Sequence, residues 1–351
     1  MTSQKKLSPK RKRRSKIRFF VIEMLVLIIV LVVLYGYVQL SKVNRADAGA
    51  IDINNLDPTT LEALDGYTNI ALFGLDNRTA GDYQNGRTDV IMVVSVNNDT
   101  NEIKLLSVYR DTYLLSDGSY VKANASYAYG GANQAINMLN QNLDLDITDY
   151  VTVDFAAVID VVDAVGGVEV KVTGNEAKLM RKPTRDLCVL EDKNPEDEYI
   201  SAGKQTLDGI QAVAYMRIRK DTGGDFKRTE RQRKIIKKVV KKVKTSNIIT
   251  LNSLLNQILP QISTSLTTGQ LTTLMLQAFS YEVTDTSGFP FEKTTMDLSV
   301  GNAVIAADLK DNVIKLHEFL YDNTDYIPSD TVTNISYEIT NATGIRTGDG
   351  Y

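Results

Sequence analysis

The sequence predicts a layered α-β-α domain of the α/β class, with a central mixed sheet and an N-terminal transmembrane helix in front of it. Three observations predict this arrangement. An apolar run covers residues 19–40, short apolar runs typical of strands follow from residue 68, and segments with helical spacing of apolar residues alternate with them. Strands that alternate with helices are typical of a sheet covered by helices.

The N-terminal segment has the composition of a signal-anchor. Nine Lys and Arg side chains lie in residues 1–18, and Glu23 is the only charge in residues 19–40. A helix of that length would measure about 33 Å, enough to cross a bilayer. The basic tail is expected to stay in the cytoplasm, so the remainder would face outward. The alternative is a cleaved signal peptide, for which residues 47–50 (Asp-Ala-Gly-Ala) are a poor cleavage site.

Residues 41–66 are predicted to form an extracytoplasmic spacer, and the folded domain is expected to span residues 67–330. Three short apolar runs near its start are typical of buried strands: residues 68–75, 90–96 and 102–108. A glycine pair then precedes a helical pattern over residues 132–142. A buried helix over 154–165 ends at a second glycine pair, and the alternating segment VEVKV follows as a strand.

The second half of the domain is predicted to be mainly helical. The segment 174–203 is polar, contains two prolines, and is predicted to be a long excursion from the fold. Apolar residues at helical spacing predict five helices, at 207–214, 229–244, 250–259, 268–279 and 308–321. Residues 331–351 are expected to form a C-terminal tail.

Composition excludes several kinds of site. Cys188 is the only cysteine, so an intrachain disulfide is impossible, and His317 is the only histidine. A zinc site built on histidines or a Ser-His-Asp triad is therefore not expected.

The chain has a formal net charge of −3, yet residues 217–244 hold 13 basic against three acidic side chains. A local basic cluster on an acidic body favours a pocket for one anionic ligand and argues against nucleic-acid binding.

The basic cluster contains residues suited to holding a phosphate. If the segment MRIR is extended, Arg217 and Arg219 leave the same face, and each presents a planar fork that matches phosphate oxygens. Arg228 and Gln232 lie near the predicted start of the long helix, and helix N-termini attract anions. The alternative is that these arginines pair with surface carboxylates.

Three further clusters place aspartate and arginine together at predicted strand ends. They are GLDNR with Asp76 and Arg78, GRTDV with Arg87 and Asp89, and YRDTY with Arg110 and Asp111. Carboxylates can hold a hard divalent cation, and arginines can neutralise phosphate oxygens, so the set suits a phosphate ligand with a metal. Each cluster taken alone is equally consistent with a salt-bridged turn.

Seven motifs in order resemble the LytR–CpsA–Psr family of bacterial cell-envelope proteins. They are GLDNR, GRTDV, SVYRDTY, KANASYAYGG, VVDAVGGVEV, LDGIQAVAYMRIRK and GDFKRTERQ, and they cover roughly residues 67–245. The chain departs from the family pattern at Tyr109, where proline is common, and at Asn77, where serine is common. Neither departure removes a charged group, although the loop at Arg110 is expected to be shaped differently.

The resemblance implies a single-pass membrane protein of a Gram-positive bacterium. Its catalytic domain would be a phosphotransferase on the outer face of the cell membrane. It would move an anionic glycopolymer, such as teichoic acid or capsule, from a polyprenyl-pyrophosphate carrier to peptidoglycan. The residues expected to carry the reaction are Asp89, Arg110, Arg217 and Arg219. The resemblance further implies that Mg²⁺ or Mn²⁺ is bound by Asp76 and Asp89, and that the pyrophosphate is bound by Arg78, Arg87, Arg110, Arg217, Arg219, Asp225, Arg228 and Gln232.

Several points stay open in the sequence. Asp89 and Asp111 are both candidates for the base that deprotonates the acceptor hydroxyl. The helices at 132–142, 154–165 and 229–243 have aliphatic faces that could line a slot for the polyprenyl tail. The alternative functions are a polyprenyl-pyrophosphate hydrolase, a membrane-bound transcriptional regulator and a non-catalytic binder of anionic polymer. The identity of the polymer is not determined.

Overall fold

The computed structural model describes residues 36, 38–45, 51–76, 83, 86–219, 221 and 223–335. The chain divides into two compact units, residues 1–42 and residues 43–351. In the first unit, the described residues Gly36 and Val38–Leu40 are helical and are followed by a turn. Across the described ranges no helix combines the length and the apolar character of a membrane span. The predicted span 19–40 lies mostly outside the described residues, so it stays a prediction.

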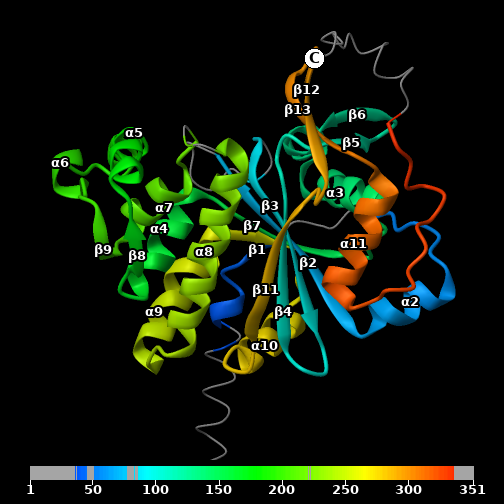
Figure 1. Cartoon of the computed structure of the whole chain (residues 1–351). Coiled ribbons are helices and arrows are strands. Elements are labelled where there is room, and N and C mark those ends of the chain that lie inside the picture. The colour runs from blue at the N-terminus through cyan, green and yellow to red at the C-terminus, as the bar shows by residue number, and fades with distance from the viewer. Residues whose placement is uncertain are drawn as a thin grey trace, which may run out of the picture. The chain divides into compact units, whose positions relative to one another are not determined.

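The second unit is built on a mixed sheet whose described strands pair in the order β1-β10-β7-β2-β3-β4-β11 (Figure 1). Its central strands are β2 (Tyr67–Leu75), β3 (Thr88–Asn97) and β4 (Glu102–Val108), which pair antiparallel with one another. β7 (Asp149–Val153) adds to β2 in parallel, and β11 (Glu282–Phe289) adds to β4 in parallel. Two short strands, β10 (Ile262–Thr264) and β1 (Asn44–Arg45), complete the edge beyond β7. The predicted α/β fold with a central mixed sheet is confirmed.

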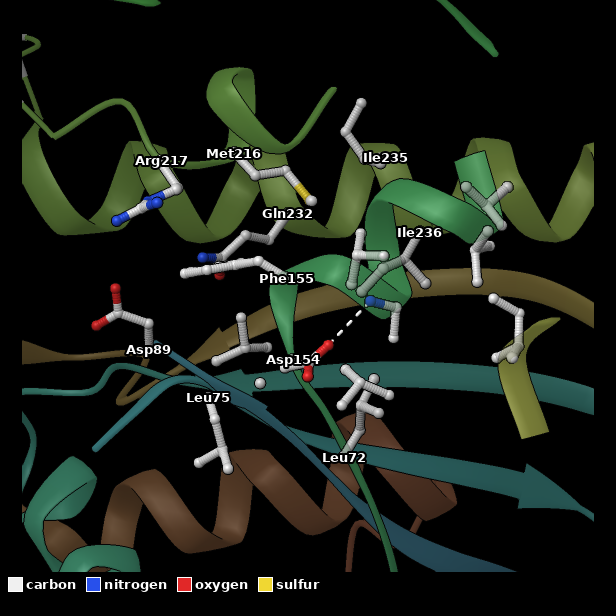
Figure 2. Close-up of a pocket in the computed structure, with 18 of the residues that line it drawn as sticks. Leu72, Leu75, Asp89, Asp154, Phe155, Met216, Arg217, Gln232, Ile235 and Ile236 are labelled. Carbon is white, nitrogen blue, oxygen red and sulfur yellow. Dashed lines mark hydrogen bonds between the residues drawn. The ribbon is translucent and has the colours of Figure 1, made fainter. Parts of the chain in front are cut away.

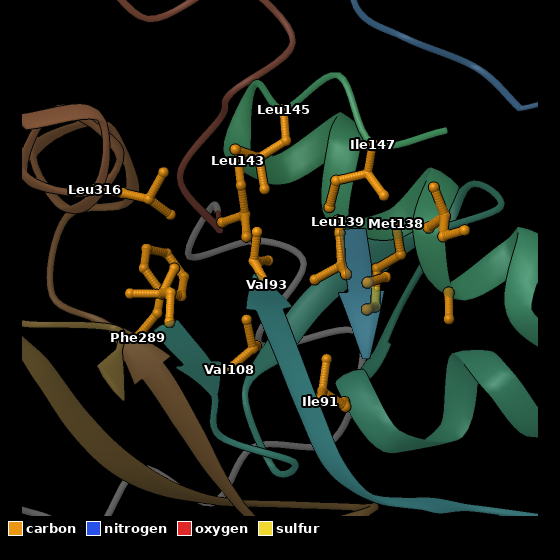
Figure 3. Close-up of a cluster of buried hydrophobic side chains, with 14 of the residues drawn as sticks. Ile91, Val93, Val108, Met138, Leu139, Leu143, Leu145, Ile147, Phe289 and Leu316 are labelled. Carbon is orange, nitrogen blue, oxygen red and sulfur yellow. The ribbon is translucent and has the colours of Figure 1, made fainter. Parts of the chain in front are cut away.

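One face of the sheet is covered by α2 (Pro58–Asp65), α3 (Ala123–Leu143) and α11 (Leu309–Tyr321) (Figure 1). Aliphatic side chains from these helices and from the sheet form the larger core, which includes Val93, Leu139 and Leu316 (Figure 3). Each fully buried Leu or Ile contributes about 1.5–3 kcal/mol relative to exposure.

The other face is covered by α4 (Phe155–Ala164), α7 (Gly209–Met216), α8 (Gly224–Lys244) and α9 (Ile248–Ile258) (Figure 1). Ile236 and Val240 of α8 pack against Met92 of β3. Because both faces are covered, β3 is buried along nearly its whole length and shows no simple alternation. α4 and α7 approach closely at Gly209, where a Cβ atom would lie 2.4 Å from the carbonyl oxygen of Ile159.

Three small hairpins and several short elements complete the unit. The hairpins pair β5 (Tyr113–Ser116) with β6 (Ser119–Lys122), β8 (Val168–Val172) with β9 (Gly203–Leu207), and β12 (Lys293–Leu298) with β13 (Gly301–Ala306). The remaining elements are α5 (Gly174–Leu190), α6 (Pro195–Glu198), η1 (Leu259–Gln261) and α10 (Thr268–Gln277). The predicted strand at 168–172 is confirmed, but it belongs to a hairpin outside the main sheet.

The segment 174–203 is not the excursion that its composition predicts. Residues 174–190 form α5, which begins with a capping box between Thr173 and Glu176. Met180, Leu187 and Cys188 of α5 are buried against α7 and the β8–β9 hairpin. The prediction was wrong because it rested on the polar composition and the two prolines, whereas the helix continues through Pro183 and keeps one apolar face.

The segment 41–66 also differs from expectation. Residues 58–65 form α2, and Leu56 and Leu64 belong to the main core. Asn54 donates from Nδ2 to the carbonyl oxygens of Asn140 and Gln141 at 3.1 and 3.0 Å. The described residues 51–66 are therefore packed on the domain, through Leu56 and Leu64 in the main core and through the hydrogen bonds of Asn54 to α3. The division into domains otherwise stays a prediction.

Candidate active site

The three Asp- and Arg-containing clusters meet because β3 runs antiparallel to both of its neighbours. β2 ends at Leu75, which is in register with Thr88 at the start of β3, and β4 ends at Val108. The end of β2, the start of β3 and the end of β4 therefore share one edge of the sheet. The backbone N–H of Asp76 donates to the carbonyl oxygen of Arg87 at 3.4 Å, which ties the first two clusters together.

Asp89 is the centre of the site. Its side chain is 7% exposed and is bound by guanidinium groups from three separate elements. Arg110 Nη1 lies 2.8 Å from Asp89 Oδ1, Arg219 Nη2 binds Oδ2, and Arg228 Nη1 lies 3.7 Å from Oδ2. Arg228 Nη2 also donates to the Asp89 carbonyl oxygen at 3.3 Å. Residues 89, 110, 219 and 228 are thus brought together by the fold.

A second carboxylate, Asp225, lies beside the same arginines. Arg228 Nη2 is 2.6 Å from Asp225 Oδ1, and Arg110 Nε is 3.6 Å from it. Arg110 Nε also donates to Asp111 Oδ2 at 3.3 Å, and Lys122 Nζ lies 3.3 Å from Asp111 Oδ1. The cations in the site only slightly outnumber the carboxylates that contact them. An incoming anion would therefore compete with Asp side chains for the same guanidinium groups.

Asp76 and Arg217 form the outer part of the site. Arg217 Nη2 lies 3.3 Å from Asp76 Oδ1, and its guanidinium carbon lies 4.4 Å from the ring centroid of Phe155. The segment MRIR is not extended, since α7 continues to Met216 and Arg217 caps its C-terminus with φ −91° and ψ 0°. The condition of an extended segment is therefore not met, because the helix predicted at 207–214 continues to Met216. Arg217 and Arg219 nevertheless bind neighbouring aspartates.

The long helix begins five residues earlier than its apolar spacing predicts. α8 starts at Gly224, and Gly223 before it has φ 114°. Arg228 and Gln232 therefore lie on one face of the helix, four residues apart, and not at its opening. Arg231 lies on another face, where it binds Asp221 and Glu176 and takes no part in the Asp89 cluster.

The electrostatics of the two buried carboxylates differ. Burial by itself would raise the pKa of Asp89, but the guanidinium groups of Arg228, Arg219 and Arg110 outweigh burial and hold that pKa below its ordinary value. Burial also raises the pKa of Asp225, and Arg228 and Arg110 offset this only in part. Asp89 is therefore the firmly ionised anchor of the arginines.

An apolar pocket with a volume of about 180 Å³ opens from the Asp89 cluster. Asp89, Arg217, Arg228 and Gln232 line its polar end, and the rest is lined chiefly by apolar side chains of β2, α4 and α8. Figure 2 shows Asp89 and Arg217 at one side and Leu72 and Ile236 farther along. Asp154, which caps α4 by accepting from Ala157 N at 2.9 Å, holds the helix against β7.

The pocket tests the predicted tail slot in part. The segments 154–165 and 229–243 contribute aliphatic side chains to it, as expected. The segment 132–142 does not line it, because α3 lies on the opposite face of the sheet and packs into the main core. Helical spacing alone cannot tell which face of a sheet a helix covers.

Several buried polar atoms at this end of the pocket have no hydrogen-bond partner among the described residues. They are Arg228 Nε and Nη1, Asp225 Oδ2 and Gln232 Oε1. Buried polar groups in proteins are nearly always satisfied, and an unsatisfied cluster is expected where a polar ligand completes it. The two Arg228 nitrogens offer hydrogen-bond donors at the polar end of an apolar slot, which suits a ligand with an anionic head and a hydrocarbon tail.

Other predicted site residues lie differently. Arg87 is exposed, and Arg78 and Asn77 lie outside the described residues. Phe155 and Lys122 contact site residues but were not predicted. Phe155 begins α4, directly after β7 and the capping residue Asp154. The β7 sequence DYVTV has only five residues and starts with a polar one, so it was not recognised as a strand. Tyr109, the departure from the family pattern, is buried and packs edge-on against Phe226 at 4.6 Å between ring centroids.

No group of three or more His, Cys, Asp or Glu side chains converges as a metal site within the described ranges. Of the two carboxylates predicted to hold a metal, Asp76 pairs with Arg217 and Asp89 pairs with Arg219. Mg²⁺ is commonly held by one or two carboxylates together with substrate phosphates, so a two-carboxylate set fits such an ion only when a phosphate ligand supplies the rest.

The chain is similar to known proteins in sequence and in fold. Residues 30–312 match the LytR–CpsA–Psr family. The polyisoprenyl-teichoic acid–peptidoglycan teichoic acid transferase TagU of Enterococcus faecalis is 32% identical over 211 residues, which cover 59% of this chain and 61% of that protein. The corresponding transferase TagV of Bacillus subtilis is 30% identical over 326 residues, covering 87% and 78%.

A solved structure of the LytR-CPS2A-psr family protein YwtF (TagT), with bound octaprenyl pyrophosphate lipid, has the same fold. It superposes with a TM-score of 0.55 at 20% identity, covering 78% of this chain and 97% of that chain. Because the family match spans most of the chain and includes both the mixed sheet and the arginine cluster, the protein belongs to the LytR–CpsA–Psr family.

Proposed function

We propose that this protein is a glycopolymer–peptidoglycan phosphotransferase, which takes an anionic polymer of the teichoic acid type from a polyprenyl-pyrophosphate carrier. The observation that carries the proposal is the apolar pocket that ends at Arg217, Arg228 and Gln232. A diphosphate with a hydrocarbon tail matches both ends of this pocket. The names of the TagU and TagV relatives support the same chemistry.

The arginine cluster suits phosphoryl transfer, a reaction that depends mostly on positioning and on stabilising charge. Arg228 is 1% exposed, and its Nε and Nη1 have no hydrogen-bond partner among the described residues, so it is placed to bind an oxygen of the pyrophosphate. Arg217 lines the same pocket, and Arg110 and Arg219 meet Arg228 at Asp89, so these three would bind the remaining oxygens. Binding exchanges Asp–Arg contacts for phosphate–Arg contacts, which limits the cost of removing these charges from water.

We propose further that Mg²⁺ or Mn²⁺ is held by Asp76 and Asp89 together with the pyrophosphate. The ion would neutralise charge on the phosphate oxygens as the bond to the carrier breaks. Asp89 then has two roles, since its carboxylate also aligns Arg110 and Arg219. A lowered pKa keeps this carboxylate ionised and available to a cation.

Of the two candidate bases, Asp111 suits the role better. The Asp89 side chain is only 7% exposed, whereas the Asp111 side chain is 22% exposed. Asp111 lies at the mouth of the site, where one oxygen meets Lys122 and the other meets Arg110. An acceptor hydroxyl can approach it from solvent without entering the arginine cluster.

We also propose that residues 19–40 anchor the protein in the cell membrane, with residues 1–18 in the cytoplasm and the catalytic domain outside. The charge difference across the apolar run supports this orientation. An anchor would hold the domain near a lipid-borne substrate and raise its effective concentration.

The function is tested with the full chain in detergent, a polyprenyl-pyrophosphate-linked polymer labelled in its sugar, and peptidoglycan. Transfer of label to peptidoglycan is expected, and Arg228→Ala should abolish it. Lys310→Ala is the control, because Lys310 is an exposed cation of α11, on the opposite face of the sheet from the site. Label recovered only as free polymer phosphate would mean a hydrolase, and binding without any bond cleavage would mean a non-catalytic binder.

A further inference from the structure

Helix α5 is firmly attached to the domain but presents an unusual exposed face. Its inner side is fixed by Met180, Leu187 and Cys188 in the core and by Glu176, which Arg231 Nε contacts at 3.1 Å. Its outer side carries Lys178, Lys182, Arg185 and Val189, at the spacing of one helical face. Val189 is 76% exposed and the adjacent Leu190 is 46% exposed.

This face borders a groove of about 540 Å³ that adjoins the active site. We call it the α5 groove, defined by its lining residues Asp76, Phe155, Lys182, Asp186, Val189, Leu190 and Arg217. Phe155 and Arg217 also line the apolar pocket, so the two cavities meet at the stacked pair that these side chains form. The arginine cluster therefore has the tail pocket on one side and the α5 groove on the other.

We propose that the α5 groove binds the first sugar-phosphate units of the donor polymer, directly beyond its pyrophosphate. The inference rests on the proposed function and assigns it a subsite. In the donor, the sugar and the hydrocarbon tail are attached to opposite ends of the pyrophosphate. With the tail in the apolar pocket and the pyrophosphate at Arg217 and Arg228, the sugar must leave on the far side, where the groove begins.

The charge of α5 favours an anionic chain over a neutral one. The helix carries four basic side chains, Lys178, Arg181, Lys182 and Arg185, and two acidic ones. Glu176 is bound to Arg231, and Asp186 pairs with Lys182 at 2.7 Å. That surface pair is weak, so Lys182 can be recruited by a phosphate of the polymer.

The exposed apolar residues fit the same occupant. Val189 and Leu190 offer a small nonpolar surface beside a lysine and an aspartate. A pyranose ring has a face of C–H bonds that can cover such a surface while its hydroxyl groups reach Asp186 and Asp76. Burying the two side chains on binding removes apolar area from water, which is favourable at about 25 cal/mol per Å².

The test compares donors with and without sugar on the purified full chain. Lys182→Ala combined with Val189→Asp removes a cation and places a carboxylate where the polymer phosphate would lie. We expect about a tenfold rise in KM for a polyprenyl-pyrophosphate-linked disaccharide phosphate, with kcat and the KM for peptidoglycan little changed. Binding of polyprenyl pyrophosphate without sugar should stay within about twofold of the parent protein.

Ile327→Asp is the control, because Ile327 is 75% exposed and is not part of the groove. An unchanged KM for the sugar-bearing donor would overturn the proposal. It would also be overturned by a rise in the KM for peptidoglycan alone, which would place the acceptor in the groove, or by an equal loss of the sugarless lipid. If the parent protein transfers nothing, the proposed function fails, while the affinity difference between sugar-bearing and sugarless lipids still decides the subsite.

Discussion

The buried pair of Arg228 and Asp225 allows a sharp stability prediction. Replacing Arg228 by Met keeps most of the side-chain volume but removes the guanidinium that lies 2.6 Å from Asp225 Oδ1. Asp89 keeps two other guanidinium partners, Arg110 and Arg219, so it is not left alone. Asp225 keeps only Arg110 Nε at 3.6 Å, and it becomes the carboxylate that suffers most.

The magnitude follows from this geometry. Breaking a buried ion pair by removing one partner costs about 3–5 kcal/mol, because the remaining charge is uncompensated. The residual contact with Arg110 puts Arg228→Met near the lower end, at about 3 kcal/mol. Adding Asp225→Asn removes the stranded charge, so the double variant should lose only about 1 kcal/mol. The coupling between the two positions is then roughly 2 kcal/mol or more.

Urea unfolding of the parent chain, both single variants and the double variant, followed by circular dichroism at pH 7, measures these values. Lys227→Met is the matched control, since Lys227 is the exposed neighbour that pairs with Glu230, and it should change stability by less than about 0.5 kcal/mol. A loss below about 1 kcal/mol for Arg228→Met, or strictly additive effects in the double variant, would refute the reasoning that the pair is buried and compensated.

Three further outcomes are expected. Ile236→Trp should fill part of the apolar pocket and weaken binding of long-chain polyprenyl pyrophosphate by about tenfold, while inhibition by inorganic pyrophosphate is unchanged. Leu276→Trp, at an exposed position outside the pocket, is its control. Equal losses of affinity for both ligands would contradict a tail site. Burial lowers the pKa of His317 to about 4, so stability should fall by about 3 kcal/mol as the pH drops from 6.5 to about 4; denaturant titrations should find this slope absent in His317→Gln. The pKa of Asp89 lies below its ordinary value of 3.8, so the stability that ionised Asp89 contributes is present above pH 3.8 and is lost as the pH falls through the lowered pKa. Asp89→Asn should remove this loss of stability in acid. An unchanged acid unfolding transition in that variant would contradict the prediction.

The elements that the sequence predicted well are those with strong local patterns. β2, β3 and β4 are apolar runs bounded by turn residues, and α9, α10 and α11 begin after capping side chains such as Asn247 and Thr267. The short edge strand β10 was not predicted, and of the three hairpins only the strand β8 was. Strands of three to six residues carry too little periodicity to be recognised. α5 was missed because the polar composition and the two prolines outweighed an apolar face that only packing reveals.

The candidate site divides in the same way. The residue types were predictable, since aspartates and arginines at strand ends are conspicuous in an otherwise ordinary composition. The pairings were not predictable: the sequence does not show that Arg219 binds Asp89 while Arg217 binds Asp76, or that Arg231 turns away toward Glu176. These choices depend on where α7 ends and where α8 begins, and both ends differ from expectation.

By itself, the sequence determined the α/β class, the central strands and the set of charged groups suited to a phosphate ligand, because these follow from local composition and spacing. Only the tertiary structure decided which helices cover which face of the sheet, and hence that α4 and α8 line the apolar pocket while α3 does not. It also placed α5 beside the arginine cluster. The physical reason is that helical periodicity specifies an apolar face but not its partner, which is fixed by packing between residues far apart in the chain.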